Sequence, residues 1–300
     1  MVERSSKLHR DSLGNRLFDI ANYALILFLS FLFLYPFWDT LVLSFSSQQA
    51  AQELGVRLWP SEWSVGSYRE VLQSRILGIA YLNTIFRTVV GTTLSVLVTY
   101  CGAYGLSKKR LPGRNFLMTM IIITMFFSGG LIPRYVIVRS LGLVGSRWAL
   151  ILPILTTAWY LIIARNFIST IPASLEEAAI IDGGHPLTIA FRIMLPLSMP
   201  IIAVLVLWIA VWHWNEWFDA LIFVPQRSKV VLQLLLRRIL IERTAEQVFT
   251  SEAMQQSQPE TTPETLRAAA IFVSIGPILL LYPFLQKYFV KGVIIGSLKG

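Results

Sequence analysis

The sequence has few charged residues, a single cysteine and three histidines. Only 14% of its 300 residues are Asp, Glu, Lys or Arg, whereas a soluble domain carries about 25%. Because Cys101 is the sole cysteine, no disulfide can form within the chain, and we expect this side chain to pack in the core. The histidines His9, His185 and His213 do not have HExxH spacing, so we expect no metal site.

Sequence signatures of catalysis are also missing. The chain has no GxxxxGK[ST] nucleotide-binding loop, so we expect ATP and Mg²⁺ to be bound by another polypeptide and no cofactor to be held here. No Gly-x-Ser-x-Gly elbow occurs, and His213 is the only candidate base within an apolar run. The net charge of +9 comes from scattered Lys and Arg residues rather than one basic stripe, so no nucleic-acid partner is expected.

Long apolar runs dominate what is present. The chain is 55% hydrophobic, with a mean hydropathy of +0.61. A membrane-spanning helix needs about 20 predominantly apolar residues. We therefore predict an all-α membrane protein with six transmembrane helices. The qualifying stretches are approximately 20–45, 81–106, 116–138, 148–169, 193–223 and 268–289. The first run is too long for a signal-peptide core and lacks a small-x-small cleavage site, so we expect no cleaved leader.

Short basic segments predict which side of the membrane each end faces. Segment 1–17 and the turn 107–115 carry Lys and Arg without a balancing cluster of acids, which favours the cytoplasm. Over the whole chain the basic residues divide almost equally between the two sides, so the short turn carries most weight. With six spans, both termini are expected in the cytoplasm. The long outer loops would then be 46–80 and 224–267.

Local patterns add detail to these outer regions. Ser67–Leu77 and Lys229–Glu242 read as helices lying on the surface, and 244–265 is polar enough to be irregular or mobile. Gly129, Gly130 and Pro133 predict a break at the end of the third span.

Charged residues near the outer ends of the spans are the candidates for a substrate path. Arg134, Arg139 and Arg147 give a short outer segment a charge of +3, and Glu216 and Asp219 are i, i+3 neighbours at the end of the fifth span. Ionisable groups at membrane depth usually face a bundle interior or a water-filled path. The alternative is that both acids lie just outside the hydrocarbon and are solvated, and the sequence does not decide between the two.

The stretch 174–200 has the clearest helix punctuation between apolar runs. Ser174 and Glu177 form a Ser-x-x-Glu capping box, which predicts a helix start. Gly183 predicts its end, and Pro186 suits the first turn of a second helix. Leu195-Pro196 then marks the entry to the next apolar run. The result is a short helix, a tight break and another helix at a membrane surface.

This stretch resembles the EAA loop of bacterial ABC importer permeases, over about twenty positions of matching type and spacing. In that family the loop is a cytoplasmic coupling helix that docks into a groove of the ATPase subunit. Capping alone would not explain Gly183 together with Leu195-Pro196. Gly184, His185 and Pro186 depart from the pattern, which leaves the geometry of the second helix open. The ATPase-coupling residues that the resemblance implies are Glu177, Ala178, Ala179, Asp182, Gly183, Leu195 and Pro196.

Further segments resemble the carbohydrate branch of these permeases, which is MalG-like and closest to the LplC/YtcP-like group associated with oligosaccharide and polysaccharide uptake. They are Ser128–Pro133, Trp212–Phe218 and Pro283–Gly300. The resemblance implies a MetI-like, type I fold in the bacterial inner or plasma membrane, forming half of a translocation pathway. It also implies a second, different permease subunit, an ATPase dimer, an extracytoplasmic solute-binding protein and an oligosaccharide substrate.

The expected organisation follows from this resemblance. Residues 1–17 would be a cytoplasmic segment, 18–291 the six-helix permease domain with its coupling loop at 170–192, and 292–300 a cytoplasmic tail. We expect a bulky or charged residue in place of Ala179 to uncouple ATP hydrolysis from uptake while the complex still inserts. The chain itself is not expected to be an enzyme.

The substrate path is expected to include Arg134, Glu216 and Asp219. The basic outer face favours an acidic oligosaccharide, such as alginate or another uronate oligomer. Alternatively, Arg139 and Arg147 contact the binding protein or lipid headgroups. The rival function is a secondary transporter or channel with no ATPase partner. Many secondary transporters contain inverted repeats, and none is evident in this sequence. A secondary transporter would also leave the EAA loop unexplained.

Overall fold

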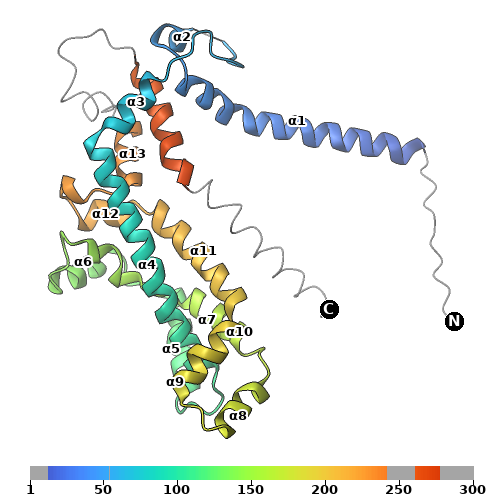
Figure 1. Cartoon of the computed structure of the whole chain (residues 1–300), viewed down its shortest axis with the longest axis vertical. Coiled ribbons are helices and arrows are strands. Elements are labelled where there is room, and N and C mark those ends of the chain that lie inside the picture. Colours follow the sequence, from blue (N-terminus) through green and yellow to red (C-terminus); the bar gives the residue numbers. More distant parts are fainter. Residues whose placement is uncertain (1–12, 54, 242–260, 278–300) are drawn as a thin grey trace. The chain divides into compact units, whose positions relative to one another are not determined.

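The computed structural model describes residues 13–53, 55–241 and 261–277 (Figure 1). Predictions made for residues 1–12, 244–260 and 283–300 lie outside them. The chain divides into two compact units, one of residues 1–70 with 254–269 and one of residues 71–253 with 270–300. Among the described residues, all regular elements are helices, apart from an isolated bridge between Ser46 and Trp63. The predicted all-α class is confirmed.

The first unit contains a long apolar helix and a compact group of polar and aromatic contacts. Helix α1 (Leu13–Ser44) covers nearly all of the predicted first span, and the described residues bury none of its most apolar stretch. The short α2 (Gln48–Gln52) follows, and the bond between the Ser67 hydroxyl and Thr265 Oγ1, at 2.8 Å, joins the start of α3 (Gly66–Gln73) to the second part of the unit. An uncovered helix of this composition suits a lipid or protein environment.

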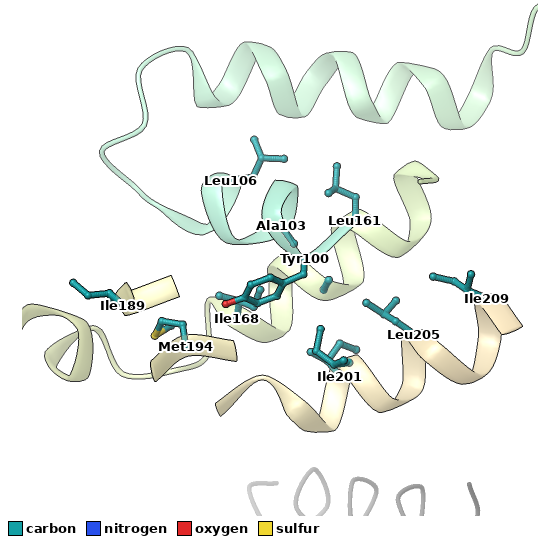
Figure 2. Packing of buried hydrophobic residues seen from close by; sticks show 12 residues of the cluster. Tyr100, Ala103, Leu106, Leu161, Ile168, Ile189, Met194, Ile201, Leu205 and Ile209 are labelled. Carbon is teal, nitrogen blue, oxygen red and sulfur yellow. The ribbon is translucent and has the colours of Figure 1, made fainter. Parts of the chain in front are cut away.

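Helix α4 (Arg75–Ser107) organises the second unit. It packs against α7 (Ala158–Ile168) and α11 (Met199–Asn215), and Figure 2 shows side chains of these three helices meeting around Tyr100. Their buried residues recur three and four positions apart, as expected for the inner stripe of a helix. The predicted second span lies inside α4, which ends at Ser107 as predicted.

Three of the predicted spans are bent. Helices α5 (Arg114–Phe126) and α6 (Leu131–Ser140) meet at 117° across the predicted glycine break, where Gly130 has φ +81°. The 3₁₀ turns η1 (Arg147–Leu150) and η2 (Leu152–Ile154) meet α7 at 51°. The fifth run bends by 80° before α11 and breaks again before α12 (Phe218–Phe223).

The break at 129–133 within the third predicted stretch is confirmed, whereas the bend before α11 and the break before α12 within 193–223 were not predicted. The described residues supply two helices long and apolar enough to cross a membrane, or up to five if each bent pair is one span. The sixth predicted stretch, 268–289, is described only as far as residue 277, and its described part belongs to a helix that starts at 263.

Three smaller predictions need correction. The helix predicted over Ser67–Leu77 is divided, because α3 ends at Gln73 and α4 begins at Arg75. Helix α13 (Leu232–Ile241) does not simply lie on the surface, since it buries an apolar stripe and packs against α4 and α12. Cys101 is exposed rather than packed in the core. Each residue turns the helix by about 100°, so Cys101 points away from the face that carries Tyr100 and Ala103.

Candidate functional site

The predicted coupling helix is α8 (Ala173–Ile181), but its start differs from the sequence prediction. Pro172 occupies the N-cap position and no side chain caps the helix, so the predicted Ser174–Glu177 capping box is wrong. The fixed φ of proline sets the entry to the helix two residues earlier and leaves Ser174 inside the first turn. Glu177 is exposed and its carboxylate is therefore accessible on the outer face of α8.

The end of α8 follows the glycine prediction closely. Gly183 has φ +79°. Its N–H donates to the Ile180 carbonyl at 3.0 Å, and the Gly184 N–H donates to the Ala179 carbonyl at 2.9 Å. This arrangement satisfies the last carbonyls of the helix. A Cβ on Gly184 would lie 2.7 Å from the Ala179 carbonyl oxygen, so the departure from the family pattern at this position has a steric reason.

The second helix of the loop is short and leads into a wider turn. His185 caps α9 (Pro186–Thr188) by accepting the Leu187 N–H at Nδ1, and Pro186 stands at the predicted first-turn position. A π-helix (η3, Ile189–Met194) and α10 (Leu195–Leu197) follow, so Leu195 and Pro196 lie in a helical turn. The Tyr100 hydroxyl donates to the Ala190 carbonyl at 2.5 Å and ties this turn to α4.

An ion pair fixes α8 to the cytoplasmic end predicted for α4. Glu176 pairs with Lys108, and the Tyr104 hydroxyl donates to the other Glu176 oxygen at 2.9 Å. The Lys108 ammonium also lies 3.8 Å from the Tyr104 ring centroid. Glu176 was not singled out from the sequence, although an acid in the first turn opposite the basic 107–115 turn was a usable signal.

Several apolar side chains of this loop are uncovered. Helix α8 buries none of its residues, and Ile181 is 85% exposed. Leu175, Ile180 and Leu187 are also exposed, as are Ala178 and Asp182. Ala179 differs, because it is partly buried against the core of the second unit. We call the exposed set Leu175, Ala178, Ile180, Ile181 and Leu187 the loop face.

A second candidate site joins α4, α6 and the break between α11 and α12. Asp219, in the first turn of α12, lies 2.7 Å from Nη2 of Arg134 on α6 and 3.9 Å from Nη2 of Arg87 on α4. Nη1 of Arg87 donates to the Glu216 carbonyl at 2.6 Å. We call Arg87, Arg134, Glu216 and Asp219 the charge cluster.

The two acids of the charge cluster have different tasks. The Glu216 carboxylate accepts the backbone N–H groups of Phe218 and Asp219 at 2.7 and 3.1 Å, which starts α12. Asp219 is left to pair with both guanidinium groups. Arg87 is 1% exposed and Asp219 4%, whereas 34% of the Arg134 side chain is exposed. Arg87 and Asp219 are thus the buried half of the cluster, and Arg134 is its accessible member.

The structure therefore brings together the three residues predicted for a substrate path. Glu216 and Asp219 do not share one helical face, because the helix breaks between them. Of the two interpretations left open by the sequence, Asp219 fits the interior one, and Glu216 is partly buried. Arg139 is exposed, and Arg147 lies over the Phe86 ring at 5.7 Å from its centroid.

Sequence reasoning missed Arg87, although a signal was present. It is the only charged residue between positions 81 and 106, within an otherwise uncharged predicted span. A lone buried arginine in such a span requires a partner, because an unpaired charge at that depth is costly. Its partner, Asp219, lies 132 positions further along the chain, and the topology that joins them is not visible in local patterns.

His213 lies beside a small cavity in the same bundle. It is 1% exposed, and a Cβ on Gly91 would lie 2.5 Å from its Nε2. The cavity, about 120 Å³, is lined by Ser95, Tyr160 and Trp212 among others. Within the part of the chain that the structure describes, neither imidazole nitrogen nor the Ser95 hydroxyl has a hydrogen-bond partner, so the two do not form a serine–base pair.

Comparisons with known proteins agree with this architecture. Residues 114–295 match the family described as binding-protein-dependent transport system inner membrane component. The chain is 41% identical over 286 residues to the polygalacturonan/rhamnogalacturonan transport system permease protein YtcP of Bacillus subtilis, covering 95% of this chain and 99% of YtcP. It is 38% identical over 299 residues to LplC of the same organism, covering 98% of each.

A solved structure is similar over nearly the whole chain. It is a chain of a bacterial ABC transporter involved in the import of the acidic polysaccharide alginate. The similarity has a TM-score of 0.85 at 33% identity and covers 93% of this chain and 98% of that one.

Proposed function

This chain belongs to the family of binding-protein-dependent transport inner membrane components, and we propose that it serves as one permease subunit of an ATP-driven importer for anionic oligosaccharides or polysaccharides. Members of this family are multi-pass proteins of the bacterial inner membrane and are not themselves enzymes. An importer permease of this class works with an ATPase and a substrate-binding protein. The fold, a MetI-like helical permease fold, is the one expected for such a subunit.

The observation that carries the coupling part of the proposal is the loop face. An apolar surface on a helix that buries none of its own residues suits a groove in a partner protein. The ATPase is that partner in this proposal, with ATP and Mg²⁺ bound there. Glu177 and Asp182 flank the apolar contact with charge, and Gly183 and Gly184 fix the angle at which the loop leaves α8.

In this proposal, contacts between the loop and α4 transmit the movement of the loop to the bundle. Glu176 links α8 to Lys108 and Tyr104 at the end of α4, and Tyr100 holds the π-turn one helical turn earlier. A rigid displacement of α8 would therefore move the end of α4 with it. In the proposal, closure of the ATPase dimer drives this displacement and turns the pathway outward, and ATP hydrolysis resets it.

The proposed organisation keeps six spans with both termini in the cytoplasm and residues 18–291 as the permease domain. A second, different permease subunit supplies the other half of the pathway. Apolar residues left uncovered here, such as those of α1, suit lipid and that partner.

The substrate class is proposed from the relatives and from the charge cluster together. Polygalacturonan, named for YtcP, and alginate, named for the solved relative, are both polymers of uronic acids. A partly exposed arginine at the end of a spanning segment would attract their carboxylates.

The test is uptake by the reconstituted importer. Proteoliposomes would contain this chain, its partner permease and the ATPase, with the binding protein loaded with a neutral or a uronate oligosaccharide outside. We expect accumulation that requires ATP and persists when ion gradients are collapsed, with uronate oligomers preferred. Accumulation driven by an ion gradient without ATP would instead establish a secondary transporter.

A further inference from the structure

A cavity of about 600 Å³ opens beside the charge cluster. It lies between the glycine break before α6, α6 itself and the turn preceding α7, and Phe218 of α12 also lines it. This volume is in the range of ligand pockets, about 300–1,000 Å³. Among the described residues that line it, Arg134 is the only charged one and none carries a carboxylate.

The N-terminus of α6 adds to the positive character of this cavity. Ser128, Gly129, Gly130 and Leu131 all line it, and Gly130 occupies the N-cap without a side chain that caps the helix. The first amide groups of a ten-residue helix therefore start at the cavity wall. Such amide groups and the helix dipole favour an anion. Here the helix end acts together with a guanidinium group on the same helix.

Arg134 can change partners without leaving a buried charge alone. Asp219 is shared by two guanidinium groups, at 3.9 Å from Arg87 and 2.7 Å from Arg134, so Arg87 would remain as its counter-charge if Arg134 turned away. Arg87 Nη2 and Nε have no hydrogen-bond partner among the described residues, so both donors could strengthen that pairing. The partly exposed Arg134 is accordingly available to a ligand at a small electrostatic cost.

We propose that this cavity is a carboxylate-binding site and that Arg134 exchanges between Asp219 and a carboxylate of the transported glycan. The identity of the ligand as a uronate rests on the proposed function; the anion selectivity of the cavity does not. Exchange breaks the ionic link between α6 and α12, so occupancy of the cavity is communicated to the α11–α12 break and through Arg87 to α4.

Charge-selective labelling tests the site without assuming a substrate. Ile137 lines the cavity with a well-exposed, apolar side chain, so Ile137→Cys in a Cys101→Ser background places one thiol there. The assembled importer in membrane vesicles is treated with an anionic (sulfonatoethyl) or a cationic (trimethylammonioethyl) methanethiosulfonate. Thiols that remain unmodified are then reacted with a second, heavier reagent, and the mass shift of this chain gives the unmodified fraction.

We expect the anionic reagent to react faster, relative to its rate with a free thiol, than the cationic one. Arg134→Gln should lower this ratio about tenfold, because one nearby charge acts oppositely on the two reagents. Arg139→Gln is the matched control, since it removes an exposed arginine from the same helix outside the cavity lining, and should leave the ratio nearly unchanged. Equal effects of the two variants would overturn the site.

The ligand is then tested on the same thiol. Trigalacturonate should protect Ile137→Cys from the uncharged reagent methyl methanethiosulfonate, whereas its methyl ester should not, and Arg134→Gln should abolish protection. Anion selectivity with equal protection by acid and ester would overturn the carboxylate exchange. If the anionic reagent is preferred but the assembled importer shows no ATP-dependent uptake of the uronate oligomer, the proposed function is refuted and the anion site still stands.

Discussion

Arg87 of α4 and Asp219 of α12 form an ion pair at 3.9 Å with both side chains almost fully buried. Desolvation of two charges is expensive, and further contacts to each group offset part of that cost. The Glu216 carbonyl on Arg87 and the Arg134 guanidinium on Asp219 are those contacts. The pair thus fixes the position of α12 against α4, while the exposed Arg134 remains exchangeable.

Replacing Asp219 should destabilise the chain far more than replacing Arg134. Asp219→Asn leaves Arg87 buried without a counter-charge, and breaking a buried pair costs about 3–5 kcal/mol. Arg134→Gln removes a partly exposed partner and should cost about 1 kcal/mol or less. Thermal unfolding of the purified complex in nanodiscs compares them. Equal loss of thermal stability in the two variants would contradict the division of roles within the cluster.

Gly91 is required by the position of His213. A methyl group on Gly91 would lie 2.5 Å from the imidazole Nε2, and overpacking of this kind costs about 1–3 kcal/mol. We expect Gly91→Ala to lower the thermal midpoint and His213→Ala in the same chain to restore part of the loss. If the change in thermal midpoint of the double variant equals the sum of the changes in the two single variants, the clash is not the cause.

The contact of Glu176 with Lys108 should matter for coupling more than for stability. The pair is partly exposed, so Glu176→Lys should change the free energy of unfolding by about 1 kcal/mol or less. It should nevertheless reduce stimulation of the ATPase by the loaded binding protein, because α8 loses its link to α4. The reversed pair, Lys108→Glu with Glu176→Lys, is the control and should recover much of the stimulation. No recovery would indicate a different role for these residues.

The loop face provides a sharper test of docking than Ala179. Ala179 is partly buried against the core, so a bulky residue there disturbs packing as well as any partner contact. Ile181→Asp places a charge at a position that is 85% exposed and should abolish copurification of the ATPase while the chain still inserts.

Ile241→Asp is the matched control for this variant. Ile241 is an isoleucine of similar exposure, at 64%, on α13, which belongs to a predicted outer loop. It should leave copurification unchanged. Loss in both variants would point to a general folding defect.

The sequence predicted local features well where glycine and proline determine the backbone. Gly183 ends α8, Pro186 begins α9, and Gly130 marks the bend between α5 and α6, each because the residue's own φ preference decides the structure. The predicted capping box was wrong because Pro172, two residues before Ser174, occupies the N-cap position.

The candidate site was only partly predictable. Arg134, Glu216 and Asp219 were identifiable as charges near membrane depth, but their pairing depends on tertiary contacts between distant segments. Arg87 joins α12 across 132 positions, and no local pattern reports such a contact. Cys101 shows the same limit, since an apolar run of uniform character does not reveal which side of α4 faces the core.

The most direct test of the account is the ATPase rate of the reconstituted complex. It contains this chain, its partner permease and the ATPase, and is measured with empty and with uronate-loaded binding protein. We predict at least severalfold acceleration by the loaded protein and none by the empty one. Failure of the folded chain to assemble with an ATPase, or a rate indifferent to every loaded binding protein tested, would contradict it.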